Sequence, residues 1–245
     1  MSKAQQLADH DHSLVRETAE RLVRGENTIR GKLERLFYYA RDDVKFGFPG
    51  DGDLVKASDT IRLGMGQCNN KGVLLLALCK AAGIPARIHF APIRKEIQRG
   101  LFTGLFYDRM PDMLSHSWIE AKVDGKWRRI DSYINDEPYY RAARLELEKK
   151  GWDTGYSVSC PGGECSAEFN IDTETFVQME AVVGDHGVWD DPADYFATDK
   201  YQNRPSAIKL LFYRLMIGRV NKRVEQMRAS YPAAIQSRKE KTQWN

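Results

Sequence analysis

The sequence predicts an α+β fold in which helices alternate with short antiparallel strands. Three observations predict it. An apolar helix pattern covers Cys68 to Ala82, two strand patterns flank the dipeptide Asp124-Gly125, and an amphipathic helix pattern fills 206–230. Apolar residues recur every three or four positions in a helix and alternate in a strand, so the two patterns are distinguishable. Because Asp-Gly favours a two-residue hairpin turn, part of the sheet must be antiparallel.

Local signals place the elements before the cysteine. Capping residues and apolar spacing mark helix starts, and clusters of glycine mark loops. The predicted elements are a helix over 14–23 capped by Ser13, a helix from the cap Asn27 to Ala40, a loop over 47–52 and a short helix over 59–63.

The elements from Cys68 onwards follow the same rules. Gly83 is suited to end the helix at the C′ position, with Pro85 two residues beyond it. The later predictions are a strand over 86–92, an irregular segment over 94–113, hairpin strands over 117–123 and 126–133, a helix over 137–150, a loop-rich stretch over 151–170, a strand over 176–183 and the last helix over 206–230.

The 245 residues predict a single domain. We expect a core over about 27–135, a helical N-terminal segment over 1–26 and a C-terminal extension over 136–245. The apolar stripe of the last helix could dock on the rest of the chain or mediate a homodimer. Its basic face is either solvated or recognises an acidic substrate.

Composition excludes several classes of protein. Lysine and arginine (37) nearly balance aspartate and glutamate (34), so the net charge is +3 and nucleic-acid binding is not expected. The longest apolar run, Val73 to Cys79, is too short to cross a membrane. The N-terminus lacks the apolar stretch of a secretory signal, so we expect a cytoplasmic protein.

The four cysteines are too few for a disulfide framework. Cys79, in the middle of an apolar run, fits a core residue. Cys160 and Cys165 form the only close pair. They could be incidental thiols in a Gly/Pro turn, a redox-sensitive disulfide or half of a metal site, but His186 is the only later histidine and a zinc site needs more ligands.

Cys68 is unusual because a reactive side chain stands at the start of an apolar helix. Gly64 and Gly66 before it allow the backbone to approach a ligand, and unpaired N–H groups gather in the first turn. The positive end of the helix dipole stabilises a thiolate, so we expect a lowered pKa for Cys68. The polar residues 69–71 should keep this turn solvated, and Gly72 should let a strand pack closely.

A thiolate nucleophile needs a base, and His116 is the best placed of the five histidines. With Asp124-Gly125 as the hairpin loop, Asp131 lies opposite Trp118 in the resulting register. His116 and Asp131 then become diagonal neighbours on one face, about 7–8 Å apart. This inference depends on the register, because a one-residue bulge would move Asp131 to the other face. The alternative is a histidine on an edge strand and an aspartate in a solvated turn.

Four segments together resemble the transglutaminase-like domain, which belongs to the papain-like cysteine enzymes. They are GQC at 66–68, KAAGIPAR at 80–87, HSWIE at 116–120 and DGKWRRID at 124–131. The resemblance covers roughly 27–133. It implies a central helix with the cysteine, packed on an antiparallel sheet that carries the histidine and the aspartate. It further implies Cys68 as nucleophile, His116 as general base and then acid, and Asp131 as the carboxylate that orients His116.

The implied chemistry is acyl transfer through a thioester, and we expect a hydrolase acting on a peptide or other amide. The alternatives are an acyltransferase that forms an amide in a protein or a small molecule, and a non-catalytic binding module on the same fold. The N–H of Cys68 and one more donor would bind the oxyanion, with Gln67 as a weak candidate. Asn69 stands where animal transglutaminases usually have tryptophan, so their cross-linking specificity is not carried over. No metal or other cofactor is predicted.

Overall fold

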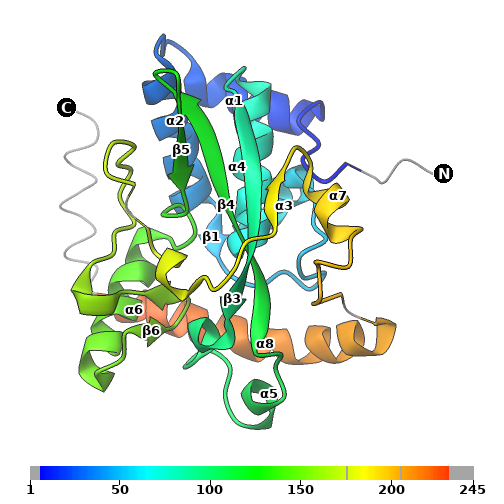
Figure 1. The fold of residues 1–245 in the computed structure, drawn as a ribbon, viewed down its shortest axis with the longest axis vertical. Helices are drawn as coiled ribbons and strands as arrows, with labels where there is room; N and C mark the ends of the chain where they lie inside the picture. Colours follow the sequence, from blue (N-terminus) through cyan, green and yellow to red (C-terminus); the bar gives the residue numbers. More distant parts are fainter. Residues whose placement is uncertain (1–5, 175, 205, 232–245) are drawn as a thin grey trace.

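A four-stranded antiparallel sheet lies at the centre of the computed structural model, which describes residues 6–174, 176–204 and 206–231. Helix α4 packs against β3 and β4 of this sheet (Figure 1). The predicted α+β class, with a central helix on an antiparallel sheet, is confirmed. In spatial order, the strands are β5 (Lys126–Ile130), β4 (Met113–Val123), β3 (Ala86–Arg94) and β8 (Gly187–Trp189).

The other elements surround this centre. Two small sheets pair β1 (Lys45–Phe46) with β2 (Met65–Gly66) and β6 (Thr154–Gly155) with β7 (Val158–Ser159). The α-helices are α1 (Ser13–Val23), α2 (Ile29–Tyr38), α3 (Ala57–Leu63), α4 (Cys68–Ala81), α5 (Leu105–Asp108), α6 (Glu137–Lys150), α7 (Pro192–Phe196) and α8 (Ala207–Ser230). Short π or 3-10 segments are η1 (Tyr39–Asp43), η2 (Lys95–Gln98), η3 (Pro161–Gly163) and η4 (Met179–Ala181).

Helix α4 is enclosed on all sides. Every residue from Cys68 to Cys79 is buried, as expected for a helix whose apolar residues surround its axis. Leu74, Leu75 and Leu76 are completely buried, and each such side chain contributes about 1.5–3 kcal/mol. The helix ends where predicted. Gly83 follows with φ of +72°, a conformation that glycine adopts without strain.

The β4–β5 hairpin forms in the predicted register. Asp124 and Gly125 both have positive φ, as a type I′ turn requires. The pairing runs from the turn to Ile130. β5 ends there rather than at Tyr133, so Asp131 is the first residue beyond the strand.

Strand β4 extends further than predicted at its N-terminal end. It begins at Met113 rather than Ser117, because β3 pairs with it along its whole length. β5 covers the other edge only from Ile119 onwards. Among the described strands, none pairs with that edge over 113–118.

Two helix caps and one strand differ from the predictions. α1 is capped by His12 rather than Ser13, and α2 by Thr28 rather than Asn27, because the neighbouring imidazole or hydroxyl reaches the free N–H. The strand predicted over 176–183 is wrong: the backbone there forms a turn of 3-10 helix, η4, after two N–H groups that bind a buried carboxylate.

Helix α8 forms as predicted and runs across one end of the molecule (Figure 1). Its apolar stripe, however, has two different halves. Val220 and Val224 are buried, and Arg228 pairs with the buried Asp136 of the segment before α6. The first half is exposed, at 58–69% for each of Ile208, Leu211, Phe212 and Leu215. A homodimer through this half stays a prediction.

The extension after the hairpin packs on the same core as α4. Tyr139, Tyr195 and Tyr201 are all buried in it. Cys160 and Cys165 are joined by a disulfide, the second of the three alternatives for this pair. Within the described part of the chain, no helix has the length and apolar content needed to span a membrane.

Candidate active site

Cys68 is the first residue of α4, and Gln67 caps the helix. Oε1 of Gln67 accepts a hydrogen bond from the N–H of Asn69 at 3.0 Å. The same oxygen accepts the thiol proton of Cys68, with 2.8 Å between it and Sγ. Cys68 is only 8% exposed, so the sulfur is almost closed to solvent.

The first turn of α4 is buried, which contradicts the prediction that polar residues keep it solvated. Asn69, Asn70 and Lys71 have no exposed surface. The structure replaces water with main-chain acceptors: Nζ of Lys71 donates to the carbonyl groups of Arg41 and Ile134 at 3.1 and 2.7 Å. Burial lowers the pKa of Lys71 to about 7. Polar residues in a sequence therefore did not identify a wet surface here.

The pKa of Cys68 is raised, opposite to the direction predicted from its place at a helix start. Burial is the largest cause, and the negative charge of Asp53 is the next. The N–H groups of Asn69 and Ser117 face the sulfur and lower the pKa by less. In this conformation Cys68 is a protonated thiol at neutral pH.

The start of α4 lies close to β4. Nδ2 of Asn69 donates to the carbonyl oxygen of Ser115 at 3.3 Å. Gly72 makes this approach possible, since a Cβ there would lie 2.9 Å from Oγ of Ser117 and 3.0 Å from the hydroxyl of Tyr133. The predicted close packing at Gly72 is confirmed. Because alternate side chains on a strand point to opposite faces, His116 lies on the face of β4 opposite to that on which Ser117 meets α4.

His116 is completely buried and carries no hydrogen bond. Neither ring nitrogen has a partner among the residues that the structure describes. Burial lowers the pKa of His116 to about 3, so the imidazole is neutral at pH 7. Trp118, two residues along the strand, lies beside it with 6.2 Å between ring centroids. A neutral imidazole with unused nitrogens is the state that a general base requires.

Asp131 is also completely buried, and a different segment holds it. Its carboxylate oxygens accept hydrogen bonds from the N–H groups of Val177 and Gln178, at 2.8 and 2.9 Å. Burial raises the pKa of Asp131 to about 7, and these N–H groups oppose that shift. Its charge also raises the pKa values of Cys68 and Tyr133.

All three predicted residues are buried, but they do not form a hydrogen-bonded row. The thiol of Cys68 donates to Gln67, and Asp131 accepts from the backbone of 177–178. His116 bonds to neither. The triad therefore stays a prediction after the geometry is known, as does Gln67 as an oxyanion donor. Nε2 of Gln67 donates to Asp53 in this structure.

Sequence analysis missed Asp53, whose carboxylate accepts from the side chains of Gln67, Asn69 and Tyr201. No motif or spacing marks an aspartate in a loop before a short helix. Tyr201 is 148 residues away in the sequence, so only the folded chain brings it to this carboxylate.

The segment around Tyr201 also covers the site. The amide of Asn203 occupies the uncovered edge of β4: its Oδ1 accepts from the N–H of Ser115 at 2.6 Å, and its Nδ2 donates to the carbonyl of Met113 at 3.1 Å. Tyr201 contacts Asp53 on the α4 side. This part of the extension therefore connects the two sides of the site.

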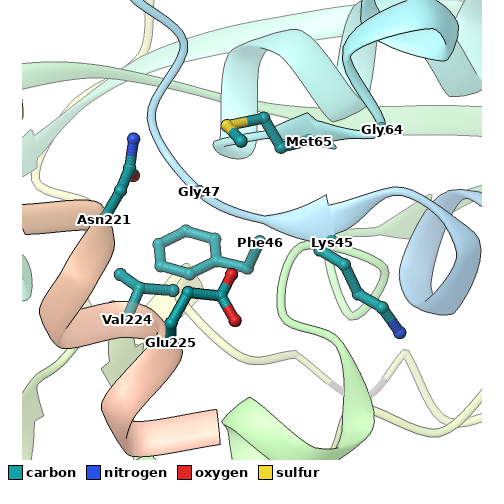
Figure 2. Close-up of a pocket in the computed structure, with 8 residues that line it drawn as sticks. All are labelled: Lys45, Phe46, Gly47, Gly64, Met65, Asn221, Val224 and Glu225. Atoms are coloured by element: carbon teal, nitrogen blue, oxygen red, sulfur yellow. The ribbon is translucent and has the colours of Figure 1, made fainter. Parts of the chain in front are cut away.

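Neither of two cavities in the described part of the chain is lined by Cys68, His116 or Asp131. Figure 2 shows one of about 100 Å³ between the β1–β2 pair and α8, lined by residues such as Phe46 and Val224. The other, about 420 Å³, is lined by Trp152 and its neighbours. The chemistry near Cys68, rather than cavity volume, identifies the candidate site. No group of three metal-binding side chains is found in the described residues.

Comparison with known proteins finds one family. Residues 16–132 match the model of the transglutaminase-like superfamily. The predicted resemblance to the transglutaminase-like domain is confirmed over these residues. A search of curated proteins finds no significant match.

Solved structures give two similar folds. The first is named "Putative Cysteine Protease from Cytophaga hutchinsonii", with a TM-score of 0.46 and 17% identity over 78% of this chain and 46% of that one. The second is named a "putative protease from Parabacteroides distasonis", with a TM-score of 0.35 and 18% identity over 51% of this chain and 25% of that one. This chain therefore spans about half of the length of the first protein and a quarter of the length of the second.

Proposed function

We propose that this protein is a cysteine-dependent enzyme that hydrolyses a peptide or other amide bond, with Cys68, His116 and Asp131 as its catalytic residues. One observation carries the proposal: Nδ2 of Asn69, the residue after Cys68, donates to the carbonyl oxygen of Ser115, the residue before His116, at 3.3 Å. The start of α4 and the part of β4 that carries His116 are therefore neighbours, and His116 and Asp131 are both completely buried.

Activation begins with an exchange of partners. The thiol of Cys68 leaves Oε1 of Gln67 and donates to a ring nitrogen of His116, which then takes the proton. The imidazole can accept the proton because it is neutral and neither nitrogen has a partner within the described residues. The negative charges of the new thiolate and of Asp131 raise the pKa of His116 from its resting value of about 3. Asp131 stabilises the imidazolium that forms, and the new positive charge in turn lowers the pKa of Asp131 below its present value of about 7.

Acyl transfer then follows in two stages. The thiolate of Cys68 attacks the amide carbonyl carbon, and the carbonyl oxygen becomes an oxyanion near the N–H of Cys68, which is free at the helix start. The imidazolium of His116 gives its proton to the leaving amine as the C–N bond breaks, which leaves a thioester. A water molecule, deprotonated by His116, attacks the thioester and restores the thiol. Gln67 could donate to the oxyanion only after its Nε2 leaves Asp53.

The same thioester can pass to an amine instead of water, which would make the protein an amide-forming acyltransferase. The acceptor that reaches the thioester decides between the two outcomes, and the triad is compatible with both. A non-catalytic binding module is the third alternative. It would use the same fold without forming a covalent intermediate.

Acylation of the protein by p-nitrophenyl acetate tests the proposal. We expect an acetyl adduct on Cys68 in the intact mass and loss of ester turnover by at least about 10³-fold in C68A. Cys79→Ala is the matched control, because Cys79 is fully buried in the same helix and should not be acylated. Equal labelling of wild type and C68A would refute the nucleophile. Adding methylamine to a turnover assay on a peptide library would distinguish acid from N-methylamide products by mass.

A further inference from the structure

Two side-chain amides surround the sulfur of Cys68, and both present their oxygens to it. Oε1 of Gln67 lies 2.8 Å from Sγ and Oδ1 of Asn69 lies 3.9 Å from it. The nitrogens of both amides donate to the same oxygen, Oδ1 of Asp53. The two amides are thus aligned alike, with one carboxylate on their nitrogen side.

Hydrogen-bond chemistry makes this alignment obligatory. An ionised carboxylate accepts hydrogen bonds and donates none, so an amide that faces Asp53 must turn its NH₂ group towards it. The amide oxygen of Gln67 then points to the sulfur. The reverse orientation would place the NH₂ group of Gln67 against the N–H of Asn69, which now donates to Oε1 at 3.0 Å.

Asp53 is itself fixed from the opposite direction. Its second oxygen accepts from the hydroxyl of Tyr201, in the C-terminal extension, at 2.8 Å. Asp53 keeps some exposed surface, yet its carboxylate lies deep enough that desolvation raises its pKa, against the effect of its three donors. Both oxygens are therefore occupied, and the carboxylate cannot turn without breaking bonds on both sides.

We propose that Asp53 is a positioning residue that orients Gln67 and Asn69 so that their side chains present amide oxygens, rather than NH₂ groups, to the sulfur of Cys68. An environment of acceptors beside a negative charge stabilises the thiol against the thiolate. Asp53 thereby keeps the nucleophile protonated until His116 removes the proton. The inference rests on the proposed function only in that it gives Cys68 the role of nucleophile.

The other titratable groups near the sulfur lie on separate elements. They are His116 on β4, with Asp131 and Tyr133 after β5. Unlike these three groups, Asp53 also bonds to both amides beside Cys68. Its substitution therefore changes the orientation of the amides and the local charge together.

The test is the pH dependence of the reaction of Cys68 with iodoacetamide, followed by intact mass, with C68A as the blank. In D53N the negative charge beside the sulfur is removed, and the amide nitrogens of Gln67 and Asn69 lose the carboxylate that holds them. The N–H of Asn69 still donates to Gln67, and Nδ2 of Asn69 still donates to Ser115. We expect the apparent pKa of Cys68 to fall by about one unit, which makes alkylation at pH 7 roughly tenfold faster than in wild type.

Asp51→Asn is the matched control, because Asp51 is exposed, bonds to Arg214 and carries the same charge two residues away. Its profile should overlay that of wild type. A D53N profile that overlays that of D51N, or moves to higher pH, would overturn the proposal. If circular dichroism shows that D53N does not fold, Y201F replaces it: loss of one bond to Asp53 should shift the profile in the same direction by less, and no shift would overturn the proposal.

This experiment is independent of turnover. A shift in D53N without any acyl adduct on Cys68 would support the role of Asp53 and refute the proposed function. An acyl adduct on Cys68 with an unshifted D53N profile would support the proposed function and refute the role of Asp53.

Discussion

The two sides of the candidate site are held in different ways. On the α4 side, Cys68 donates to Gln67, whose amide is fixed in turn by Asp53. On the sheet side, His116 has no hydrogen bond within the described residues, although it is completely buried. The proposed nucleophile is held by a hydrogen bond and the proposed base is not. Activation therefore requires a change of hydrogen-bond partner at the sulfur rather than a rearrangement of the fold.

Burial acts on both sides in the same direction, towards neutral groups. It raises the pKa values of Cys68 and Asp131 and lowers that of His116. A thiolate–imidazolium pair is therefore not the resting state in this conformation. We expect the charges to form when a substrate displaces the present hydrogen-bond partner of Cys68. Substitutions on each side of the site test whether the thiol and the imidazole are separate at rest.

The largest expected effect comes from removing the base. His116→Asn should lower amide or ester turnover by about 10²–10⁴-fold, the usual contribution of a general base. The reaction of Cys68 with iodoacetamide should keep its pH profile, because the resting thiol bonds to Gln67 and not to His116. Stopped-flow turnover and alkylation rates on the same samples give both numbers.

The control for this substitution is His12→Asn. His12 is distant from His116 in the sequence and caps α1. Asparagine is also a good helix cap, so turnover should not change. If His116→Asn moves the alkylation profile of Cys68 to much higher pH, the thiol and the imidazole are already paired at rest. The difference between a bonded Cys68 and an unbonded His116 would then be wrong.

The unpaired state of His116 also predicts a dependence of stability on pH. Burial lowers its pKa from 6.5 to about 3, so the unfolded chain binds a proton that the folded chain excludes. The stabilisation is complete above pH 6.5 and is lost as the pH falls towards 3. Between pH 7 and pH 5 the loss is about 2 kcal/mol.

Urea unfolding of wild type and His116→Gln at pH 7 and pH 5 measures this term. Asp131 has the opposite sign, because its raised pKa favours the folded state at low pH, so the difference between the two proteins is the informative quantity. Wild type should lose about 2 kcal/mol more than the variant on acidification. Equal losses would show that His116 is solvated or paired.

Features with local signals were predictable from the sequence. The end of α4 at Gly83 and the hairpin at Asp124-Gly125 each depend on a few adjacent residues, so the register followed from the turn alone. The predicted pairing of Asp131 with Trp118 does not form, because the pairing ends at Ile119 and Ile130. The family motifs supplied the rest of the core, and the match over 16–132 agrees with them.

Features that depend on distant contacts were not predictable. Asp53 receives Tyr201 from the extension, and Asp131 receives N–H groups from 177–178, in a segment where a strand was expected. Burial of Lys71 inverted the expectation of a solvated turn. Each case depends on a chain segment that covers the site, and no local pattern specifies where such a segment returns.

The smallest effect concerns the contact that joins the two sides. In Gly72→Ala the new Cβ would lie 2.9 Å from Oγ of Ser117, so α4 must move away from β4. Overpacking costs about 1–3 kcal/mol, and alanine in a helix regains about 1 kcal/mol. We therefore expect a net loss of about 1 kcal/mol in the free energy of unfolding.

Gly218→Ala in α8 is the matched control, because nothing lies within 4 Å of the Cβ that it would add. It should raise stability by up to about 1 kcal/mol through helix propensity alone. Opposite signs for the changes in the free energy of unfolding of the two variants would separate the cost of close packing from the gain in helix propensity. Since Gly72 also sets how closely the N–H of Ser117 approaches the sulfur, Gly72→Ala should in addition slow alkylation of Cys68 at neutral pH. A Gly72 variant as stable as the Gly218 variant would mean that α4 and β4 are not in close contact, and the adjacency of Cys68 and His116 would lose its physical basis.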